Sequence, residues 1–332
     1  MNSVAFPSEE EYVSQMAHGA LLNPRVDTTF KALFTQPTEE SKAALKSFIE
    51  AAIEQKVKNV HLTANNAPKA FEGQRGVDYD IACELDDGRA VDIEMQAFNQ
   101  AYDYGKRAEY QVARLETTYL KKGESWEKAP IVYQITVLDF VYAPKTKQAI
   151  NRFAMRTKDG LELSNSLNII FIELPKIEDR ENSLETNTLL ENWALFLKEV
   201  DNPQKQGLIQ RLTYKEEGLM QAQKSLSNIS SDVSYWIAQY HMELRERDEL
   251  SSREAMRKLG LEEGRAEGRK KGRAEGRAEG RAEGRAEGRA EGRAEGRAEE
   301  KREAARNALS MGLSAEQAAK ITGLSVAEIA LL

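Results

Sequence analysis

The residues best suited to chemistry lie in a short acidic segment that runs from Gly76 to Gln96. Apolar and polar residues alternate in both halves of this segment, which is the period of a half-buried strand. Between the halves, the run 86–88 (Asp-Asp-Gly) fits a three-residue hairpin loop in which Gly88 takes a positive φ. The sequence therefore predicts a β-hairpin with one apolar face and one face made mainly of carboxylates.

The three-residue loop sets the register of the two strands. On the polar face, Asp80 is expected directly opposite Glu94. The other pairs expected on that face are Asp78 with Gln96 and Ala82 with Asp92. The apolar face is expected to hold Tyr79, Ile81, Cys83, Leu85, Val91, Ile93 and Met95.

The pairing of Asp80 with Glu94 is informative because like charges directly opposite one another destabilise a sheet. Two carboxylates about 5 Å apart, the usual cross-strand spacing, suit a hard divalent cation such as Mg²⁺, which prefers oxygen ligands. A water activated by that cation could attack a phosphodiester. A solvated polar face of an antiparallel sheet would produce the same alternation, so the hairpin alone leaves both interpretations open.

The order of several blocks resembles the PD-(D/E)XK nuclease superfamily and, more narrowly, its transposase branch, the recombination-promoting nucleases. The resemblance covers nearly the whole chain. Its blocks are Asp27-Thr-Thr-Phe-Lys-Ala-Leu-Phe34, Gly88-Arg-Ala-Val-Asp-Ile-Glu-Met-Gln96, Arg107-Ala-Glu-Tyr110, Phe171-Ile-Glu-Leu-Pro-Lys176 and Ile321-Thr-Gly-Leu-Ser325.

The resemblance implies an α/β fold with a restriction-endonuclease-like mixed sheet flanked by helices. It also implies that Asp80 and Glu94 are catalytic and hold Mg²⁺, with Mn²⁺ as a possible substitute, and that DNA is the substrate. Gln96 stands where the superfamily usually has lysine. Glutamine can orient a water by hydrogen bonds, but it carries no charge to stabilise a developing oxyanion. More of that stabilisation would then come from the metal and from Arg107, the expected phosphate contact.

Three further acids are candidates for the metal site. Asp27 could reach the metal from its helix, although a plain N-cap role is an equal alternative. Asp78 and Asp92 share the carboxylate face and are possible additional ligands. The three histidines lie far apart in the sequence, so no zinc site is expected.

Composition limits the classes of protein. The single cysteine, Cys83, rules out a disulfide within the chain and favours a reducing compartment. No segment approaches the roughly 20 apolar residues of a membrane span, and the acidic N-terminus lacks a signal-peptide pattern, so a cytoplasmic protein without a membrane partner is expected. The net charge of −7 disfavours a nucleic-acid binder overall. A local basic face remains possible on the helix after the hairpin, at Lys106, Arg107, Arg114, Lys121 and Lys122.

Apolar periodicity predicts the remaining elements of the core. A helix is expected from Asp27 to about Ile49, broken near Pro37. Strands are expected at 57–62, 131–142 and 168–174, a helix at 101–120, and helices from Ser183 onward.

The C-terminal part differs in composition. Glycine recurs at every fourth position from Gly264 to Gly296, mostly as Gly-Arg-Ala-Glu. This unit places like charges four residues apart and adds glycines that each cost about 0.5–1 kcal/mol in a helix, so an isolated helix should be weak. We expect a nuclease-like domain at 1–250, a solvated spacer at 251–303 and a small helical module at 304–332.

The terminal module has the spacing of a helix-turn-helix. Its last helix has no arginine, lysine, asparagine or glutamine to contact base edges, so homo-oligomer formation or partner docking is as well supported as DNA reading. For the whole chain, the sequence and the resemblance favour a Mg²⁺-dependent DNA endonuclease linked to transposition or recombination. The alternative is a catalytically inactive DNA-binding or assembly protein that keeps the nuclease fold.

Overall fold

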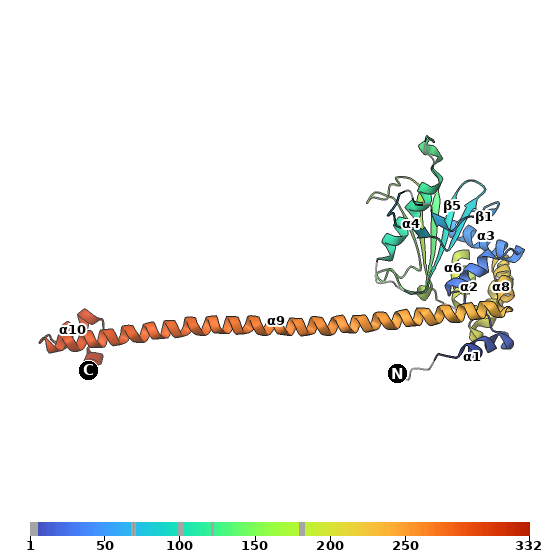
Figure 1. The fold of residues 1–332 in the computed structure, drawn as a ribbon. Helices are drawn as coiled ribbons and strands as arrows, with labels where there is room; N and C mark the ends of the chain where they lie inside the picture. Colours follow the sequence, from blue (N-terminus) through green and yellow to red (C-terminus); the bar gives the residue numbers. More distant parts are fainter. Residues whose placement is uncertain (1–5, 68, 70, 99–102, 121–122, 179–182) are drawn as a thin grey trace. The chain divides into compact units, whose positions relative to one another are not determined.

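The structure, a computed structural model, describes residues 6–67, 69, 71–98, 103–120, 123–178 and 183–332. Its centre is a mixed sheet of six strands in the order β1-β4-β5-β6-β8-β7 (Figure 1). The bounds are β1 Val60–Leu62, β4 Ile81–Leu85, β5 Ala90–Gln96, β6 Val132–Leu138, β7 Ile150–Ala154 and β8 Leu167–Glu173. Two short strands, β2 Asn66–Ala67 and β3 Val77–Asp78, pair separately.

The middle of the sheet is parallel and its edges are antiparallel. β5, β6 and β8 run parallel to one another, whereas β4 on β5, β1 on β4 and β7 on β8 are antiparallel. Parallel strands need a crossover, and α4 (Tyr104–Tyr119) connects β5 to β6. Strands buried on both faces explain why β6 and β8 read as nearly continuous apolar runs.

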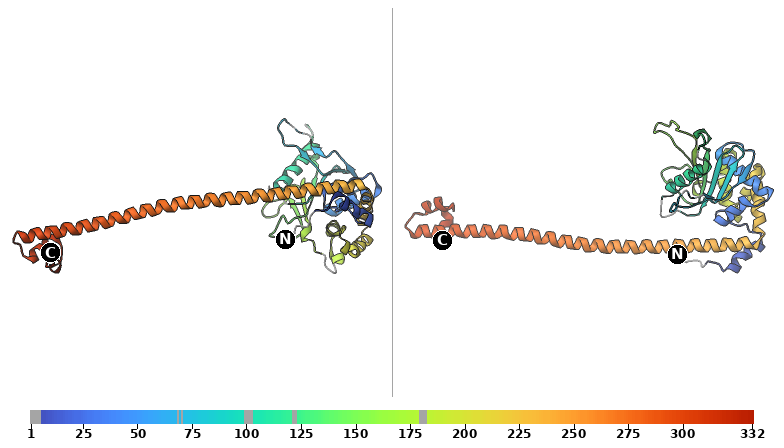
Figure 2. Two further views of the ribbon diagram at one scale, coloured as in Figure 1. Left: turned by 60° about the horizontal axis from the view of Figure 1, so that its bottom comes forward. Right: turned by 45° about the horizontal axis from the view of Figure 1, so that its top comes forward.

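Helices cover the two faces of this sheet. α4 packs on one face, where Tyr104, Ala108, Val112 and Leu115 contact apolar side chains of the strands. The opposite face belongs to a larger core with α2 (Asp27–Thr35), α3 (Glu39–Ile53), α6 (Leu189–Glu199) and α8 (Glu217–Ser230), and two further views show this layering (Figure 2). The expected α/β architecture is confirmed.

The other elements connect these layers or follow them. They are α1 Glu9–Ser14, η1 Gln15–His18, η2 Trp126–Lys128, η3 Leu174–Lys176, α5 Ser183–Thr186, η4 Pro203–Lys205, α7 Gln206–Lys215, α9 Val233–Ser310, α10 Ala315–Thr322 and α11 Val326–Ile329. Among the residues that the structure describes, none of the helices has an apolar stretch long enough to cross a membrane.

The predicted hairpin is present as β4 and β5. Ile81 pairs with Ile93, and Ala82 with Asp92, in the expected register. Gly88 has a φ of 83°, and its N–H donates to the Leu85 carbonyl at 2.9 Å. The local turn chemistry therefore sets the pairing, as the sequence indicated.

The predicted pairing is wrong before Ile81. Asp78 pairs with Asn66 of β2, and it does not face Gln96. The Tyr79 N–H donates to the Asn65 carbonyl at 2.6 Å, outside the β4–β5 ladder. Because the chain leaves the ladder here, Tyr79 packs in the α4 cluster and not with Ile81.

The other expected elements are found with shifted ends. The helix from Asp27 is two helices, α2 and α3, and the break at Pro37 occurs as expected, with Thr38 capping α3. Asp27 is the first helical residue rather than the N-cap, because Val26 holds that position and the Asp27 carboxylate binds Lys31. β1 and β6 are shorter than the predicted strands, β8 is shifted by one residue, and β7 had no clear signal in the sequence.

The chain divides into two compact units, Met1–Asp248 and Glu249–Leu332. The glycine repeats are exposed, and they are helical throughout as part of α9. A Cβ added at any glycine from Gly260 to Gly296 would meet nothing within 4 Å. Packing therefore does not require these glycines.

The end of the second unit holds two short helices, α10 and α11. Ser314 caps α10, Gly323 ends it in the left-handed conformation, and Ser325 caps α11. Ala305 and Ala308 of α9 pack with Ala318 and Ile329 in a small apolar cluster. This cluster is what folds the end of α9 together with α10 and α11.

Candidate active site

Asp80 and Glu94 meet at the open end of the hairpin. Asp80 precedes β4, and its N–H donates to Oε1 of Glu94 at 3.2 Å. The N–H of Met95, next to Glu94 on β5, donates to Oδ2 of Asp80 at 3.1 Å. The structure thus brings together the two acids that the sequence paired, through backbone-to-carboxylate bonds rather than a regular ladder pair.

Two more predicted residues contact Glu94. Gln96 follows it two positions later on β5, and its Nε2 donates to Oε2 of Glu94 at 3.4 Å. Arg107 reaches the same oxygen from α4, with Nη2 at 3.5 Å, and its guanidinium carbon lies 5.8 Å from the centre of the Tyr104 ring. One carboxylate oxygen therefore has an amide and a cation beside it.

The carboxylate face of β5 is buried. Asp92 and Glu94 are both fully buried, because α4 covers this side of the sheet. Oδ2 of Asp92 accepts from Nε2 of Gln134 at 3.3 Å, while Oδ1 has no hydrogen-bond partner among the described residues. The alternative of a solvated polar face is therefore wrong for these two acids.

Burial changes the protonation of these acids. Desolvation and the charge of Asp80 raise the pKa of Glu94 to about 8, although Arg107 opposes the shift. Desolvation, Glu94 and Asp80 raise the pKa of Asp92 well above its ordinary value. Desolvation and Asp27 raise the pKa of Asp80, against the opposing effect of Lys31. Burial is thus the largest cause of the raised pKa of each acid, and the charge of a neighbouring carboxylate adds to it.

Lys31 is the residue of this site that sequence reasoning missed. It projects from α2, and its Nζ lies 2.9 Å from Oδ1 of Asp80 and 2.9 Å from Oδ2 of Asp27. Burial works to lower the pKa of Lys31, but the two carboxylates outweigh burial and raise it. Its spacing four residues after Asp27 was a signal for that pair, whereas nothing local pointed to Asp80.

The remaining candidates are more dispersed. Asp27 reaches the site through the shared Lys31 ammonium. Asp78 is exposed on β3 and lines a neighbouring cavity. Arg114 is only 9% exposed. The prediction that it belongs to an open basic face is therefore wrong. Lys121 and Lys122 lie outside the described residues.

The donor set suits a divalent cation held by few protein ligands. No group of three or more histidine, cysteine, aspartate or glutamate side chains able to enclose a metal occurs in the described part of the chain. Mg²⁺ usually keeps several waters and takes only one or two carboxylates. The buried Asp92 oxygen without a partner and the raised pKa of Glu94 both mark a place where added positive charge is favourable.

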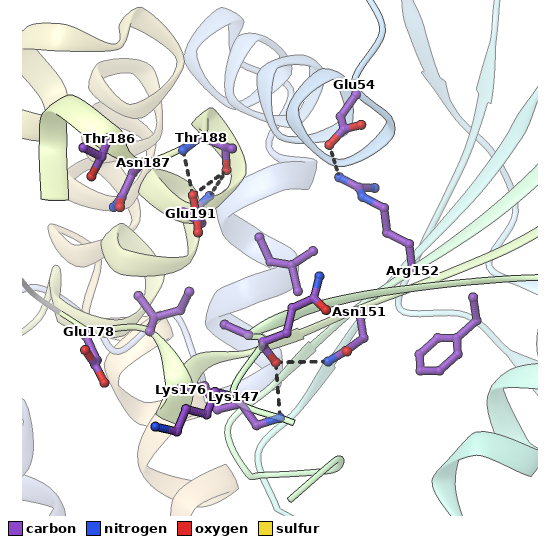
Figure 3. Close-up of a pocket in the computed structure, with 15 residues that line it drawn as sticks. Glu54, Lys147, Asn151, Arg152, Lys176, Glu178, Thr186, Asn187, Thr188 and Glu191 are labelled. Carbon is purple, nitrogen blue, oxygen red and sulfur yellow. Dashed lines mark hydrogen bonds and ion pairs between the residues drawn. The ribbon is translucent and has the colours of Figure 1, made fainter. Parts of the chain in front are cut away.

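A separate cavity of about 650 Å³ lies beside β7 and the start of α6 (Figure 3). None of the predicted site residues lines it. Its Arg152 is paired with Glu54 at 2.8 Å, and its Lys176 binds the buried Glu173 at 2.8 Å. These cations serve structural pairs, so the acids at the hairpin remain the better candidate for chemistry.

The sequence around this site matches a known protein family. The model of the PD-(D/E)XK nuclease family transposases matches residues 24–255, which include α2, the hairpin and α4. The chain belongs to this family. Comparison with curated proteins and with solved structures gives no match.

Membership of the PD-(D/E)XK nuclease family transposases agrees with the mixed sheet flanked by helices, which is a restriction-endonuclease-like fold. It indicates a nuclease-type hydrolase linked to transposition, with DNA as the substrate class. Nucleases of this superfamily usually use divalent metal ions. In this member, the hairpin acids, Gln96 and Arg107 lie together with a lysine supplied from α2.

Proposed function

We propose that this chain is a Mg²⁺-dependent DNA endonuclease that hydrolyses phosphodiester bonds in transposition or recombination. The observation that carries the proposal is the contact between Asp80 and the buried Glu94, whose pKa is raised to about 8 by burial and by the charge of Asp80. A cation bound there would relieve both desolvation and repulsion. Mn²⁺, which also accepts oxygen ligands, is expected to substitute.

Asp80 and Glu94 would hold the metal, and the unpartnered oxygen of Asp92 could support it from the same face. The metal would supply positive charge that polarises the attacking water and offsets charge developing on the phosphate. The reaction forms one bond from the water oxygen to phosphorus and breaks one bridging P–O bond. The attacking water gives up one proton, and the released oxygen takes up one proton.

The neutral Gln96 would orient the water through its amide, because it already lies 3.4 Å from Glu94 on the same strand face. Arg107 would contact a phosphate oxygen, since its side chain is one-third exposed and can exchange Glu94 for a substrate anion. Lys31 would supply from α2 a charge that Gln96 lacks, close to Asp80.

The proposal is tested by metal titration of the full chain. Mg²⁺ and Mn²⁺ should each raise the melting temperature and support nicking of supercoiled plasmid, whereas EDTA should prevent nicking. Glu94→Gln should lose both effects. A wild-type protein that gains neither stability nor nicking activity from either metal would favour the alternative, a nuclease fold retained for DNA binding or assembly.

A further inference from the structure

A second cavity adjoins the candidate active site and is not used by the proposed reaction. It has a volume of about 290 Å³ and lies between the segment containing β3 and one side of α4. Arg75 and Asp78 line it from the β3 segment, and Arg107, Tyr110 and Gln111 line it from α4. Nη2 of Arg107 also lies 3.5 Å from Oε2 of Glu94, so this residue borders both the cavity and the candidate active site.

The groups around this cavity match the parts of a nucleotide. Arg75 is exposed, and within the described part of the chain its side chain makes no ion pair, so its charge is available to a phosphate. Tyr110 is 38% exposed, and its hydroxyl donates to the Arg75 carbonyl at 3.3 Å, so the ring lies next to the Arg75 backbone. The exposed Asp78 carboxylate is an acceptor for amino groups of a base.

The size of the cavity limits what can enter it. Ligand sites for small molecules begin at about 300 Å³, so this space suits one nucleotide and is too small for a base pair. A base inside a duplex must first be unstacked and unpaired, which costs a few kcal/mol, whereas a single strand does not require this step. Stacking of a base on an aromatic ring stabilises single-strand binding without requiring a particular sequence.

We propose that this cavity binds one unpaired nucleotide of the DNA, next to the phosphate that Arg107 contacts, with its base against Tyr110. The preferred substrate is then single-stranded DNA or an unpaired segment of a duplex. This inference rests on the proposed nuclease function for its biological meaning. The binding step itself requires no cleavage.

Binding to short fluorescent oligonucleotides in EDTA tests the cavity independently of catalysis. The wild-type chain should bind a single strand about tenfold more tightly than a duplex of the same sequence, the scale expected from one stacked base. Tyr110→Ala should lower the single-strand affinity about tenfold and leave duplex affinity unchanged. Tyr110→Phe, which keeps the ring, should bind as the wild type does.

Two controls separate the cavity from general effects. Tyr214 on α7 is 95% exposed, so Tyr214→Ala removes a surface tyrosine elsewhere and should leave affinity unchanged. Arg75→Ala should weaken single-strand binding, whereas Arg211→Ala, at an exposed arginine of α7, should not.

An abasic single strand tests the wild-type protein without any substitution. It keeps the phosphates and lacks bases, so it should bind the wild type about as weakly as the normal strand binds Tyr110→Ala, and the two losses should not add. Equal affinity for single strand, duplex and abasic strand would overturn the inference. If the wild type nicks DNA with Mg²⁺ but Tyr110→Ala retains its single-strand affinity, the cavity inference fails while the nuclease proposal stands.

Discussion

The ammonium group of Lys31 on α2 lies 2.9 Å from Oδ1 of Asp80, which precedes β4. The same ammonium lies 2.9 Å from Asp27, so one cation is shared by two carboxylates. Asp80 is also in contact with the buried Glu94. This arrangement places a fixed positive charge on one side of the candidate metal site and leaves Glu94 and Asp92 with insufficient positive charge on the other.

Neutralising Asp80 or Glu94 should remove nuclease activity without lowering stability. We expect Asp80→Asn and Glu94→Gln to abolish Mg²⁺-dependent plasmid nicking, while the melting temperature of the metal-free protein stays the same or rises for Glu94→Gln, because repulsion is removed. Glu84→Gln, which changes another acid of the same hairpin, is the matched control and should keep its activity. If both site variants fail to fold, their role is structural.

Gln96 should affect turnover more than metal binding. If it orients the water, Gln96→Ala should lower the cleavage rate by about 10²-fold or more, within the range of a lost positioned catalytic group. The Mg²⁺ concentration for half-maximal thermal stabilisation should change little. Gln96→Lys should keep partial activity because it restores a donor. Wild-type cleavage rates in Gln96→Ala would exclude Gln96 from the mechanism.

Lys31 should stabilise the fold most strongly when no metal is bound. Lys31→Met removes the cation between two partly buried carboxylates, and we expect a loss of about 1–2 kcal/mol in the free energy of unfolding by urea in EDTA, between the values for surface and buried pairs. Mg²⁺ should restore part of this loss. Lys42→Met, at an exposed lysine paired with Glu39, should cost little. Equal losses in both variants would show that Lys31 has no special electrostatic role.

Metal-free stability should decrease as pH rises. Burial and Asp80 raise the pKa of Glu94 to about 8 in the folded chain, compared with 4.5 for an ordinary glutamate. Between these two pH values the folded state therefore binds more protons than the unfolded state. The stability that protonated Glu94 contributes is complete at low pH and is lost as pH rises through about 8. Melting temperatures in EDTA should fall from about pH 4.5 to about pH 8 and level off above that. The fall should be smaller in Glu94→Gln, and an equal fall in both proteins would contradict this assignment.

The second unit should be dispensable for folding of the first. A chain that ends after Gly260 keeps all of Met1–Asp248 and loses the exposed repeats, which bury almost no apolar surface. We expect its melting temperature, followed by circular dichroism, to match that of the full chain within about 2 °C. Light scattering of both proteins would show whether the terminal helices support self-association. A truncated chain that does not fold would mean that residues after Gly260 stabilise the first unit.

Features with local causes could be predicted from the sequence alone. The hairpin register from Ile81 to Ile93 follows from alternating residues and a loop glycine at positive φ. The caps at Ser314 and Ser325 follow from capping boxes within one helical turn. Such signals act over a few residues, so no knowledge of distant segments is needed.

Other features were decided only by the tertiary structure. Tyr79 and Asp78 leave the hairpin because β2, a segment without a clear strand pattern, pairs with β3. Asp92 and Glu94 are buried because α4 packs over the polar side of β5, which alternation alone could not distinguish from a solvated face. Lys31 reaches Asp80 because α2 packs against the hairpin. These contacts join segments far apart in the chain, so the sequence by itself could supply the acids of the candidate site, while packing determined their desolvation, their protonation and the cation beside them.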